Sequence, residues 1–289
     1  MVVVYSCAGL ANKMFHYALY KALELKGEDV YLDVDSYIVD RWDFENIFLT
    51  DVFDNVHYRK STKFKRAARR TLFDKVYTHL SSFFGGAYYI NWGFKYDKNV
   101  FSKSNDSYCL VGNWQSEQYF IDIKDEIYSA FQFKPFLDER NREISRKMAN
   151  ENSVAIHVRK GLSYQQEVIF DGTCPIEYYQ RAILYMKEHV KNPVFYVFTD
   201  NKEWVLKHFT DFDYTLCDWN PTSGKLNYLD MQLMSSAKHN IIANSTYSWW
   251  GAWLNKNSQK IVIAPALWFN PINKLYSQVE IVPKDWIAI

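Results

Sequence analysis

The chain has 289 residues and a formal net charge of +1 at pH 7, from 34 basic and 33 acidic side chains. Hydrophobic residues make up 48% of it and charged residues 23%, which excludes a disordered or fibrous chain and is typical of one large or two medium globular domains. The balanced charge argues against nucleic-acid binding through bulk positive charge, so we expect no nucleic-acid partner.

The cysteines and the apolar segments indicate the cellular compartment of the protein. The cysteines are far apart and form no C-x-x-C pair, so the sequence predicts free thiols rather than a zinc site or a disulfide scaffold. The apolar run at 2–5 is too short for a secretory signal, and no run of about 18 apolar residues predicts a membrane-spanning helix. We therefore expect a cytoplasmic protein.

The first half opens with a β-branched segment at 2–5, a loop of small residues at 6–12 and a helical pattern at 14–25. A second strand is predicted at 30–35, so the order is strand, loop, helix, strand, as at the start of a doubly wound sheet. Further along, the sequence predicts a strand at 108–112 and a helix at 116–131.

The second half alternates strands and helices more regularly, which predicts parallel βαβ units with both faces of the sheet covered. The predicted strands are 154–158, 194–199, 214–219, 240–245 and 260–265, and the predicted helices are 175–190, 203–209, 229–238 and 249–255. We expect two α/β domains, 1–150 and 151–289.

Two segments of the second half carry candidate ligand-binding groups. His157 and Arg159 stand two apart at the end of a predicted strand, so they point to the same side, where Arg suits a phosphate or a carboxylate. A strand-end salt bridge is the alternative. Ser245, Thr246 and Ser248 precede a Trp-rich helix, and hydroxyls with helix-start amides also suit an anion. The tryptophans of that helix are expected to pack it onto the sheet.

Taken in order, these blocks resemble glycosyltransferase family 11, the bacterial α-1,2-fucosyltransferases. The family opens with G-G-L-G-N-Q-M-F-Q-Y, and this chain reads AGLANKMFHY at 8–17. The family's H-x-R-x-G-D corresponds to 157–162, and its late block K-H-N-I-I-A-N-S-[ST]-[FY]-S-W-W-G-A-W-L stands unbroken at 238–254. GNWQSEQYF at 112–120 is similar to a fourth block. Ala11, Lys13 and Leu162 depart from the family pattern.

The resemblance implies a GT-B-like fold, in which two Rossmann-like doubly wound halves face a cleft and the second half binds GDP-β-L-fucose. It implies that Arg159 contacts the β-phosphate and Asp200 contacts guanine. Asn12 corresponds to an asparagine of the first half that faces the donor. The full set of donor-binding residues that it implies is Asn12, His157, Arg159, Asp200, Asn244, Ser245, Thr246 and Ser248. The first half, 1–150, is expected to bind the acceptor glycan.

The reaction expected from this resemblance is an inverting displacement at the anomeric carbon, with GDP as the leaving group. Arg159 and helix-terminal amides can stabilise the charge that develops on the diphosphate. Asp33 and Asp35 form a D-x-D sequence, but they end a strand of the first half, and we expect no metal and no cofactor. Glu167 and Asp171 follow the arginine motif and are the candidates for the base that accepts the acceptor's proton.

Two alternatives remain open from the sequence. The altered first loop and Leu162 are compatible with a GDP-linked transferase for another deoxysugar, such as colitose. Leu162 is also compatible with a relative that binds nucleotide sugars without catalysis, although the retained Arg159 and the intact late block argue against this.

Residues 59–70 carry seven basic side chains and no acidic one. They indicate either a solvated surface helix or a basic face that binds anionic lipid. The second interpretation predicts a peripheral protein on the inner face of the membrane, acting on a lipid-linked glycan.

Overall fold

The computed structural model describes residues 1–35, 47–61, 63–64, 76, 80, 87–102, 107–161, 167–270 and 279–289. The chain forms two compact α/β units. Unit 1 comprises Met1–Gln132 and Gln278–Ile281, and unit 2 comprises Phe133–Ser277 and Val282–Ile289. The predicted pair of parallel-sheet α/β halves is confirmed.

The boundary between the units differs from the predicted one between 150 and 151. It falls at Gln132–Phe133, because helix α5 (Glu139–Asn150) packs against α9 (Leu229–Ser235) and β5 (Ser153–Val158) of unit 2. Helix α5 was not predicted, because its residues ERNREISRKMAN are almost all polar and only Asn141 and Met148 are buried.

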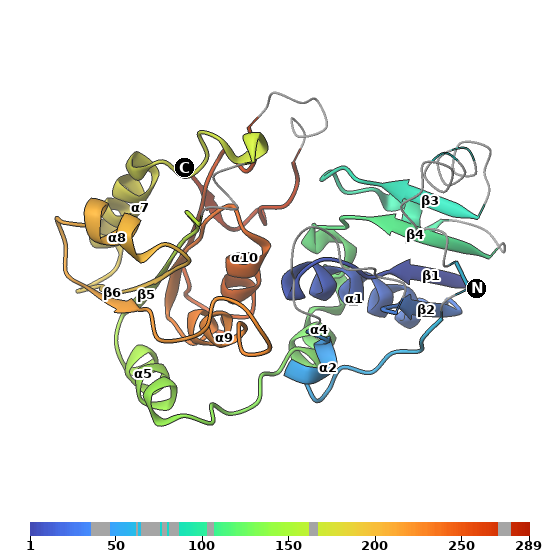
Figure 1. The fold of residues 1–289 in the computed structure, drawn as a ribbon, viewed down its shortest axis with the longest axis horizontal. Coiled ribbons are helices and arrows are strands. Elements are labelled where there is room, and N and C mark those ends of the chain that lie inside the picture. The colour runs from blue at the N-terminus through green and yellow to red at the C-terminus, as the bar shows by residue number, and fades with distance from the viewer. Residues whose placement is uncertain are drawn as a thin grey trace. The chain divides into compact units, whose positions relative to one another are not determined.

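Unit 1 is built on a four-stranded parallel sheet in the order β2-β1-β4-β3 (Figure 1). The strands are β1 (Val2–Tyr5), β2 (Val30–Asp33), β3 (Tyr88–Asn91) and β4 (Tyr108–Gly112). The order places the topological switch point, where the chain reverses its direction across the sheet, between β1 and β4. Strand β3, in the aromatic stretch, was not predicted.

The helices of unit 1 follow its strand ends. They are α1 (Leu10–Leu25), α2 (Leu49–Val52) and α4 (Lys124–Ala130), with short 3-10 turns at Lys98–Phe101, Glu117–Tyr119 and Ile121–Ile123. Helix α1 begins four residues before the predicted start, directly after the extended Gly9. The predicted helix 116–131 is wrong in its first half, because Phe120 has φ of −142° and interrupts the helical turns.

Unit 2 is built on a six-stranded parallel sheet in the order β10-β9-β8-β5-β6-β7. Besides β5, its strands are β6 (Val194–Thr199), β7 (Tyr214–Cys217), β8 (His239–Ile241), β9 (Val262–Ala264) and β10 (Ile287–Ala288). The chain runs from β5 to β7 on one side and returns to β8 on the other, so the switch point lies between β5 and β8.

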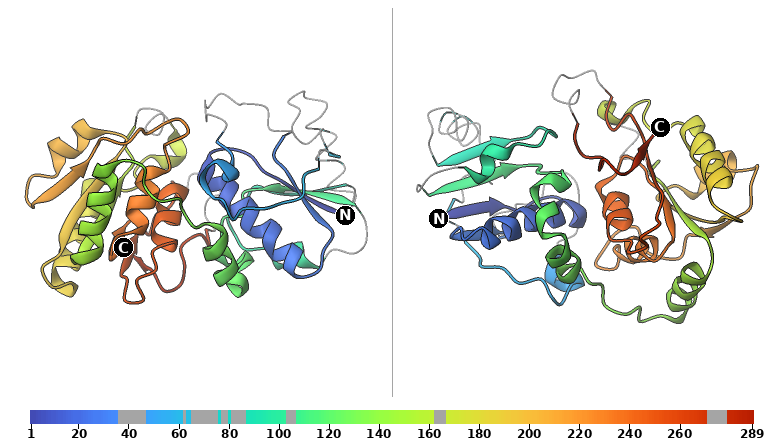
Figure 2. Two further views of the ribbon diagram at one scale, coloured as in Figure 1. Left: turned by 90° about the horizontal axis from the view of Figure 1, so that it is seen from below. Right: turned by 180° about the vertical axis from the view of Figure 1, so that it is seen from behind.

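Helices cover both faces of this sheet (Figure 2). On one face lie α7 (Ile176–His189) and α8 (Lys202–His208), which bury Tyr178, Tyr179 and Phe209 in the core with β5 and β6. On the other lie α9 and α10 (Thr246–Trp253). The Trp-rich face of α10 is buried in this layer, with Trp249 and Trp250 at 4.9 Å between ring centroids, so these tryptophans pack the helix as predicted.

The basic segment is described only in part. Lys60 forms a parallel bridge with Leu32, and Ser61 N donates to the carbonyl of Leu32 (3.4 Å), so 59–61 runs extended beside β2 and is not helical. Arg59 pairs with Asp29 (3.1 Å) and Lys60 with Asp35 (3.5 Å). Residues 65–70, which carry the rest of the predicted helix, lie outside the described residues. Within the described residues, no helix is both long and apolar enough to cross a membrane.

Candidate functional site

The candidate site of unit 2 lies at the carboxyl ends of β5 and β8, the two strands that flank its switch point. In open parallel sheets this is where ligands bind, because the loops diverge there and leave a crevice. His157 and Arg159 come from β5 and the residue after it, while the residues after β8 lead through Ser245 into α10. The two motifs singled out from the sequence therefore meet at one point of the fold.

His157 is a buried histidine with unused hydrogen-bonding capacity. Its Nδ1 is inaccessible to solvent and has no hydrogen-bond partner among the described residues. Burial, helped by the charge of Arg159, lowers its pKa to about 3, so the imidazole is neutral at pH 7. A buried polar atom without a partner is costly, and such atoms in folded proteins call for a specific reason. A ligand group bound here is such a reason.

The ring of Tyr247, on the first turn of α10, helps to hold this imidazole. The two ring centroids are 5.8 Å apart. The Tyr247 hydroxyl accepts a hydrogen bond from the amide of Met231 (2.9 Å) and donates one to the carbonyl of Asn227. Helix α10 and the segment leading into α9 thus fix the position of His157 from one side.

Asp200 holds the backbone that follows Arg159. Its Oδ1 accepts hydrogen bonds from the amides of Lys160 (2.7 Å) and Gly161 (2.9 Å). A Cβ at Gly161 would lie 2.8 Å from the other oxygen of Asp200, so the close approach requires glycine. Asn201 adds a hydrogen bond from its Nδ2 to the carbonyl of Lys160 (2.7 Å). Asp200 therefore positions the arginine loop.

The start of α10 brings Ser245, Thr246 and Ser248 together, but with different roles. Ser245 precedes the helix and its side chain accepts no hydrogen bond from the first turn, which contains no acidic residue. The partial positive charge of the helix start is thus not offset locally, and this favours an anion. Ser248 is buried and donates to the carbonyls of Ala243 (3.4 Å) and Ser245 (3.3 Å), so its hydroxyl supports the turn.

Asn244 joins three segments of unit 2 beneath the site. Its Nδ2 donates to Thr173 Oγ1 (3.0 Å) and to the carbonyl of Trp268 (2.8 Å), and its Oδ1 accepts from the thiol of Cys174 (3.3 Å). Lys160 Nζ donates to the carbonyl of Thr173 (3.1 Å). These bonds also explain why β8 ends at Ile241 instead of 245, because Asn244 turns away from the strand ladder.

The candidate bases lie on the segment that this cluster holds. Glu167 precedes a 3-10 turn, Val168–Phe170, and Asp171 follows it with an exposed side chain. Asn270 braces the segment, since its backbone amide donates to the carbonyl of Ile169 (2.7 Å) and its Nδ2 to the carbonyl of Asp171 (3.1 Å). Leu162 lies outside the described residues.

A buried carboxylate that the sequence did not single out also lies near the site. Asp230, at the start of α9, accepts a hydrogen bond from Asn220 Nδ2 (2.8 Å), and its charge acts on the hydroxyl of Tyr247. Burial raises its pKa to about 6. The only sequence signal was an acidic residue inside the otherwise core-forming pattern LDMQLMS.

Unit 1 has its own set of polar groups at the switch point between β1 and β4. Asn12 Oδ1 accepts a hydrogen bond from Gln115 Nε2 (3.0 Å), which links the first turn of α1 to the segment after β4. His16 is buried and bonded on both sides, with Nδ1 accepting from the amide of Cys7 (3.4 Å) and Nε2 donating to the carbonyl of Gly112 (3.0 Å). Lys13 donates to the carbonyl of Ile47 (2.9 Å).

The D-x-D sequence falls at the end of β2. Asp33 is buried, whereas Asp35 is exposed and pairs with Lys60. Across the described ranges, no group of three or more His, Cys, Asp or Glu side chains is placed to hold a metal ion. The described residues therefore do not complete a metal-binding group around these two carboxylates.

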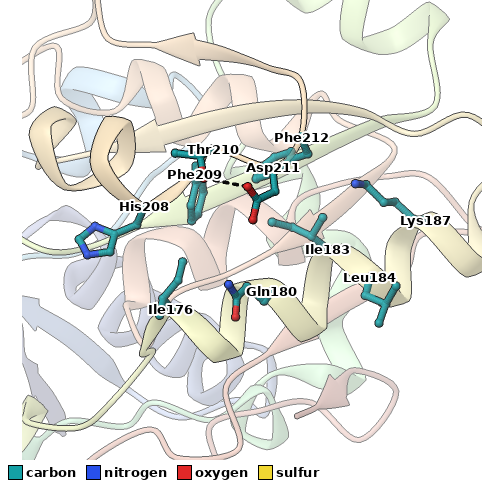
Figure 3. Close-up of a pocket in the computed structure, with 10 residues that line it drawn as sticks. All are labelled: Ile176, Gln180, Ile183, Leu184, Lys187, His208, Phe209, Thr210, Asp211 and Phe212. Carbon is teal, nitrogen blue, oxygen red and sulfur yellow. Dashed lines mark hydrogen bonds between the residues drawn. The ribbon is translucent and has the colours of Figure 1, made fainter.

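A separate hollow on the surface of unit 2 contains none of these residues. It lies between α7 and the segment 208–212, over the core side chains Ile183 and Phe209, and Thr210 donates to Asp211 at its rim (2.9 Å; Figure 3). No side chain of the candidate site lines it.

Known proteins match this chain over nearly its whole length. The model of "Glycosyl transferase family 11" matches residues 8–289. An alpha-1,2-colitosyltransferase of Escherichia coli is 30% identical, and the match covers 100% of this chain and 99% of that protein. The O-antigen biosynthesis glycosyltransferase WbnK of Escherichia coli is 32% identical, with 94% and 96% covered. Among solved structures, NodZ alpha-1,6-fucosyltransferase co-crystallized with GDP has a TM-score of 0.50 at 11% identity, covering 86% of this chain and 91% of that one.

Proposed function

Because the chain belongs to glycosyl transferase family 11 and is a glycosyltransferase, we propose that it transfers a deoxysugar from a GDP-linked donor to a hydroxyl of a surface glycan. The first candidate is L-fucose, transferred from GDP-β-L-fucose to a galactose-type hydroxyl in an α-1,2 linkage. The second is colitose, favoured by the 30% identity to an alpha-1,2-colitosyltransferase over the full length of both chains. The relative named for O-antigen biosynthesis supports a polysaccharide acceptor.

The observation that carries the donor site is the placement of His157, Arg159 and the start of α10 at one switch point. Arg159 binds the β-phosphate of GDP with its planar guanidinium, which forms charge-assisted hydrogen bonds with phosphate oxygens. Thr246 and the first-turn amides of α10 bind the same diphosphate. The neutral imidazole of His157 donates or accepts a hydrogen bond through Nδ1 to the nucleotide.

The guanine contact belongs to Asp230 better than to Asp200. Asp200 already uses Oδ1 for two backbone amides of the arginine loop, so we assign it to positioning that loop. Asp230 is a buried carboxylate near Tyr247, and guanine offers a pair of N–H donors that a carboxylate accepts. Asp230→Asn should weaken the preference for GDP over ADP in calorimetry; an unchanged preference contradicts this assignment.

The reaction is a displacement with inversion at the anomeric carbon. An acceptor hydroxyl oxygen forms the new bond to that carbon, the bond to the β-phosphate oxygen breaks, and GDP leaves with the electron pair. Arg159 and the α10 amides stabilise the charge that develops on the leaving diphosphate. Glu167 or Asp171 accepts the proton of the acceptor hydroxyl, from a segment that Asn244 and Asn270 hold in place.

The remaining expectations about the reaction and its location belong to the same proposal. The cationic groups that stabilise the leaving diphosphate make a metal or cofactor unnecessary, and the reaction takes place in the cytoplasm. Residues 59–70 attach the enzyme to anionic lipid where the acceptor is lipid-linked. Salt-sensitive binding to anionic vesicles, lost when the basic residues of 59–70 are replaced by Gln, is the expected result. Vesicle binding that depends neither on salt nor on the Gln substitutions contradicts the membrane role.

A donor panel tests the function. The purified full-length protein is incubated with GDP-L-fucose or GDP-L-colitose and a galactoside acceptor, and the products are identified by mass spectrometry. Transfer of fucose supports the first candidate and transfer of colitose alone supports the second. Calorimetry with GDP is run in parallel with Arg159→Ala as the control. Binding of GDP without transfer of either sugar identifies an inactive relative, and absence of GDP binding contradicts the proposed donor site.

A further inference from the structure

The strand ends of unit 1 carry an exposed tryptophan. Trp92 follows β3 directly and is 43% exposed, and no other tryptophan in the described part of the chain is classed as exposed. An exposed Trp presents a large flat apolar face that a ligand can cover. Its position at the carboxyl edge of a parallel sheet is where ligands are bound in such folds.

The turn that carries Trp92 is held at several points. Asn91 Oδ1 accepts from the amide of Gly93 (2.9 Å), and Asn113 Nδ2 donates to the carbonyl of Trp92 (2.7 Å). The amide of Asn113 also donates to the carbonyl of Asn91 (3.1 Å). A Cβ at Gly112 would lie 1.9 Å from that same carbonyl oxygen, so the ends of β3 and β4 approach each other as closely as glycine allows.

The short segment 279–281 braces the far side of the same turn. Val279 forms a parallel bridge with Phe94, and the amide of Glu280 donates to the carbonyl of Phe94 (2.9 Å). The Glu280 carboxylate accepts hydrogen bonds from the amide of Tyr96 (3.1 Å) and from Gln118 Nε2 (3.5 Å). The backbone that carries Trp92 is therefore held in place, and a preorganised backbone lowers the entropic cost of binding a ligand.

The groups around Trp92 indicate the chemistry of its ligand. Asn91 and Asn113 flank it in the sequence and across the sheet. The bonds that hold the turn use Asn91 Oδ1 and Asn113 Nδ2 and leave Asn91 Nδ2 and Asn113 Oδ1 to a ligand, while Glu280 holds the amide of Tyr96. Side-chain amides and a carboxylate are the usual partners of sugar hydroxyls, while the C–H face of a hexopyranose packs on an aromatic ring. A nucleotide diphosphate fits less well, since the turn is bonded to a carboxylate.

We propose that Trp92 is the stacking platform of an acceptor-sugar site on unit 1, which takes a neutral galactose-type pyranose with Asn91 Nδ2 and Asn113 Oδ1 as its hydrogen-bonding groups. The site rests on the proposed function, because it supplies the acceptor for the transfer. It also deepens that function by assigning the substrate class to named residues of unit 1.

The test compares Trp92→Ala with Ile121→Ala in the full-length protein. Ile121 is a matched control because it is an apolar side chain of unit 1 with 39% exposure. Lactose is the probe, and saturation-transfer NMR measures its binding without any donor. We expect Trp92→Ala to lose most of the lactose signal and to raise the acceptor KM about tenfold, as the loss of one well-packed aromatic contact does. Trp92→Phe should restore most of the lactose signal and bring the acceptor KM close to that of the unsubstituted protein.

GDP binding by calorimetry separates this proposal from the donor site, and we expect it to be the same in Trp92→Ala, Ile121→Ala and the unsubstituted protein. If the unsubstituted protein fails to bind GDP but binds lactose through Trp92, the proposed function fails and the sugar site stands. Absence of lactose binding, equal lactose binding by the two Ala variants, or weaker GDP binding by Trp92→Ala alone would overturn the sugar site.

Discussion

Two buried histidines lie near the switch points of the two units, and they differ in what their ring nitrogens do. Burial lowers the pKa of His16 to about 4 and that of His157 to about 3, so both are neutral at pH 7. His16 uses both nitrogens within unit 1, whereas Nδ1 of His157 has no partner among the described residues. A shifted pKa therefore reports burial in both cases, and only the unused atom separates a structural histidine from one available to a ligand.

Lys13, which follows β1, and Arg159, which follows β5, differ in the same way as the two histidines. Lys13 is buried in unit 1, where its ammonium group donates to the carbonyl of Ile47. Arg159 is only partly buried, and the loop after it is fixed by Asp200 without involving the guanidinium in those bonds. We therefore expect unit 1 to use its charge for folding and unit 2 to use its charge for the leaving diphosphate.

The largest expected effect comes from removing that charge. Arg159→Ala should lower kcat by roughly 100- to 1000-fold, the usual cost of losing one electrostatic contact to the transition state. Arg159→Lys should restore little, because an ammonium group does not replace a bidentate guanidinium. Steady-state rates with circular dichroism as the folding check measure this. A kcat within a few-fold of the unsubstituted enzyme would contradict the phosphate role.

The two histidines can be compared directly by alanine substitution. His157→Ala should weaken GDP binding about tenfold, since a hydrogen bond to a charged ligand is lost. His16→Ala leaves the amide of Cys7 and the carbonyl of Gly112 buried without partners, at a cost of about 2 kcal/mol or more. This corresponds to a Tm roughly 4–8 °C below that of His157→Ala. Calorimetry and thermal melts measure both, and equal effects on binding and Tm would remove the distinction.

Asn244 tests whether the segment of the candidate bases must be held in place. Asn244→Asp keeps the oxygen that faces Cys174 but loses the Nδ2 donor to Thr173 and Trp268. We expect kcat to fall by about tenfold or less while the Kd for GDP changes little, because the segment with Glu167 and Asp171 shifts and Arg159 does not. The readouts are kcat and GDP calorimetry. A loss confined to GDP affinity would place Asn244 on the donor instead.

Acid should destabilise the protein through the histidines. Their folded pKa values lie below the ordinary value of 6.5, so the unfolded chain binds more protons and stability falls as the pH drops from 6.5 toward 4. Asp230 acts in the opposite direction, because its folded pKa of about 6 exceeds the ordinary 3.8 and the folded state binds more protons between these values. Urea unfolding at several pH values measures this. The free energy of unfolding should fall more steeply with decreasing pH in Asp230→Asn and less steeply in His157→Ala.

The smallest expected effect is that of a chelator. If the charge of the leaving diphosphate is met by Arg159 and α10, EDTA should leave kcat unchanged. Activity that is lost with EDTA and restored by Mn²⁺ or Mg²⁺ would move the charge stabilisation from unit 2 to Asp33 and Asp35 of unit 1. The assay needs only the unsubstituted enzyme and a dialysed control.

The sequence predicted the elements that are marked by the hydrophobic pattern of their own residues. Strands 2–5, 108–112 and 194–199 are confirmed to the residue, because each is a largely apolar segment that a polar residue follows. The positions of His157 and Arg159 at a strand end could also be predicted, since alternation along a strand fixes them. Helix α5 could not, because its stability comes from the Asp138 cap and contacts with unit 2 instead of an apolar face.

Other parts depended on contacts between distant residues. Nothing local marks Asn244 as the link between Thr173 and Trp268, or Asp200 as the acceptor for the arginine loop. Trp92 stands in a stretch of many aromatic residues, and only the fold separates the exposed ring from those that fill the core. The sequence could therefore identify the candidate motif, while the positions of its supporting residues required the structure.

The return of residues 279–281 to unit 1 limits how this enzyme can be recombined with its relatives. A simple exchange at 132/133 would give unit 1 a foreign segment against Phe94 and would replace Glu280, which caps the amide of Tyr96. A chimera that takes its second unit from another family member must therefore keep these three residues of the original chain. Unit 1 is thus discontinuous in the sequence, with all of 133–277 lying between its two segments.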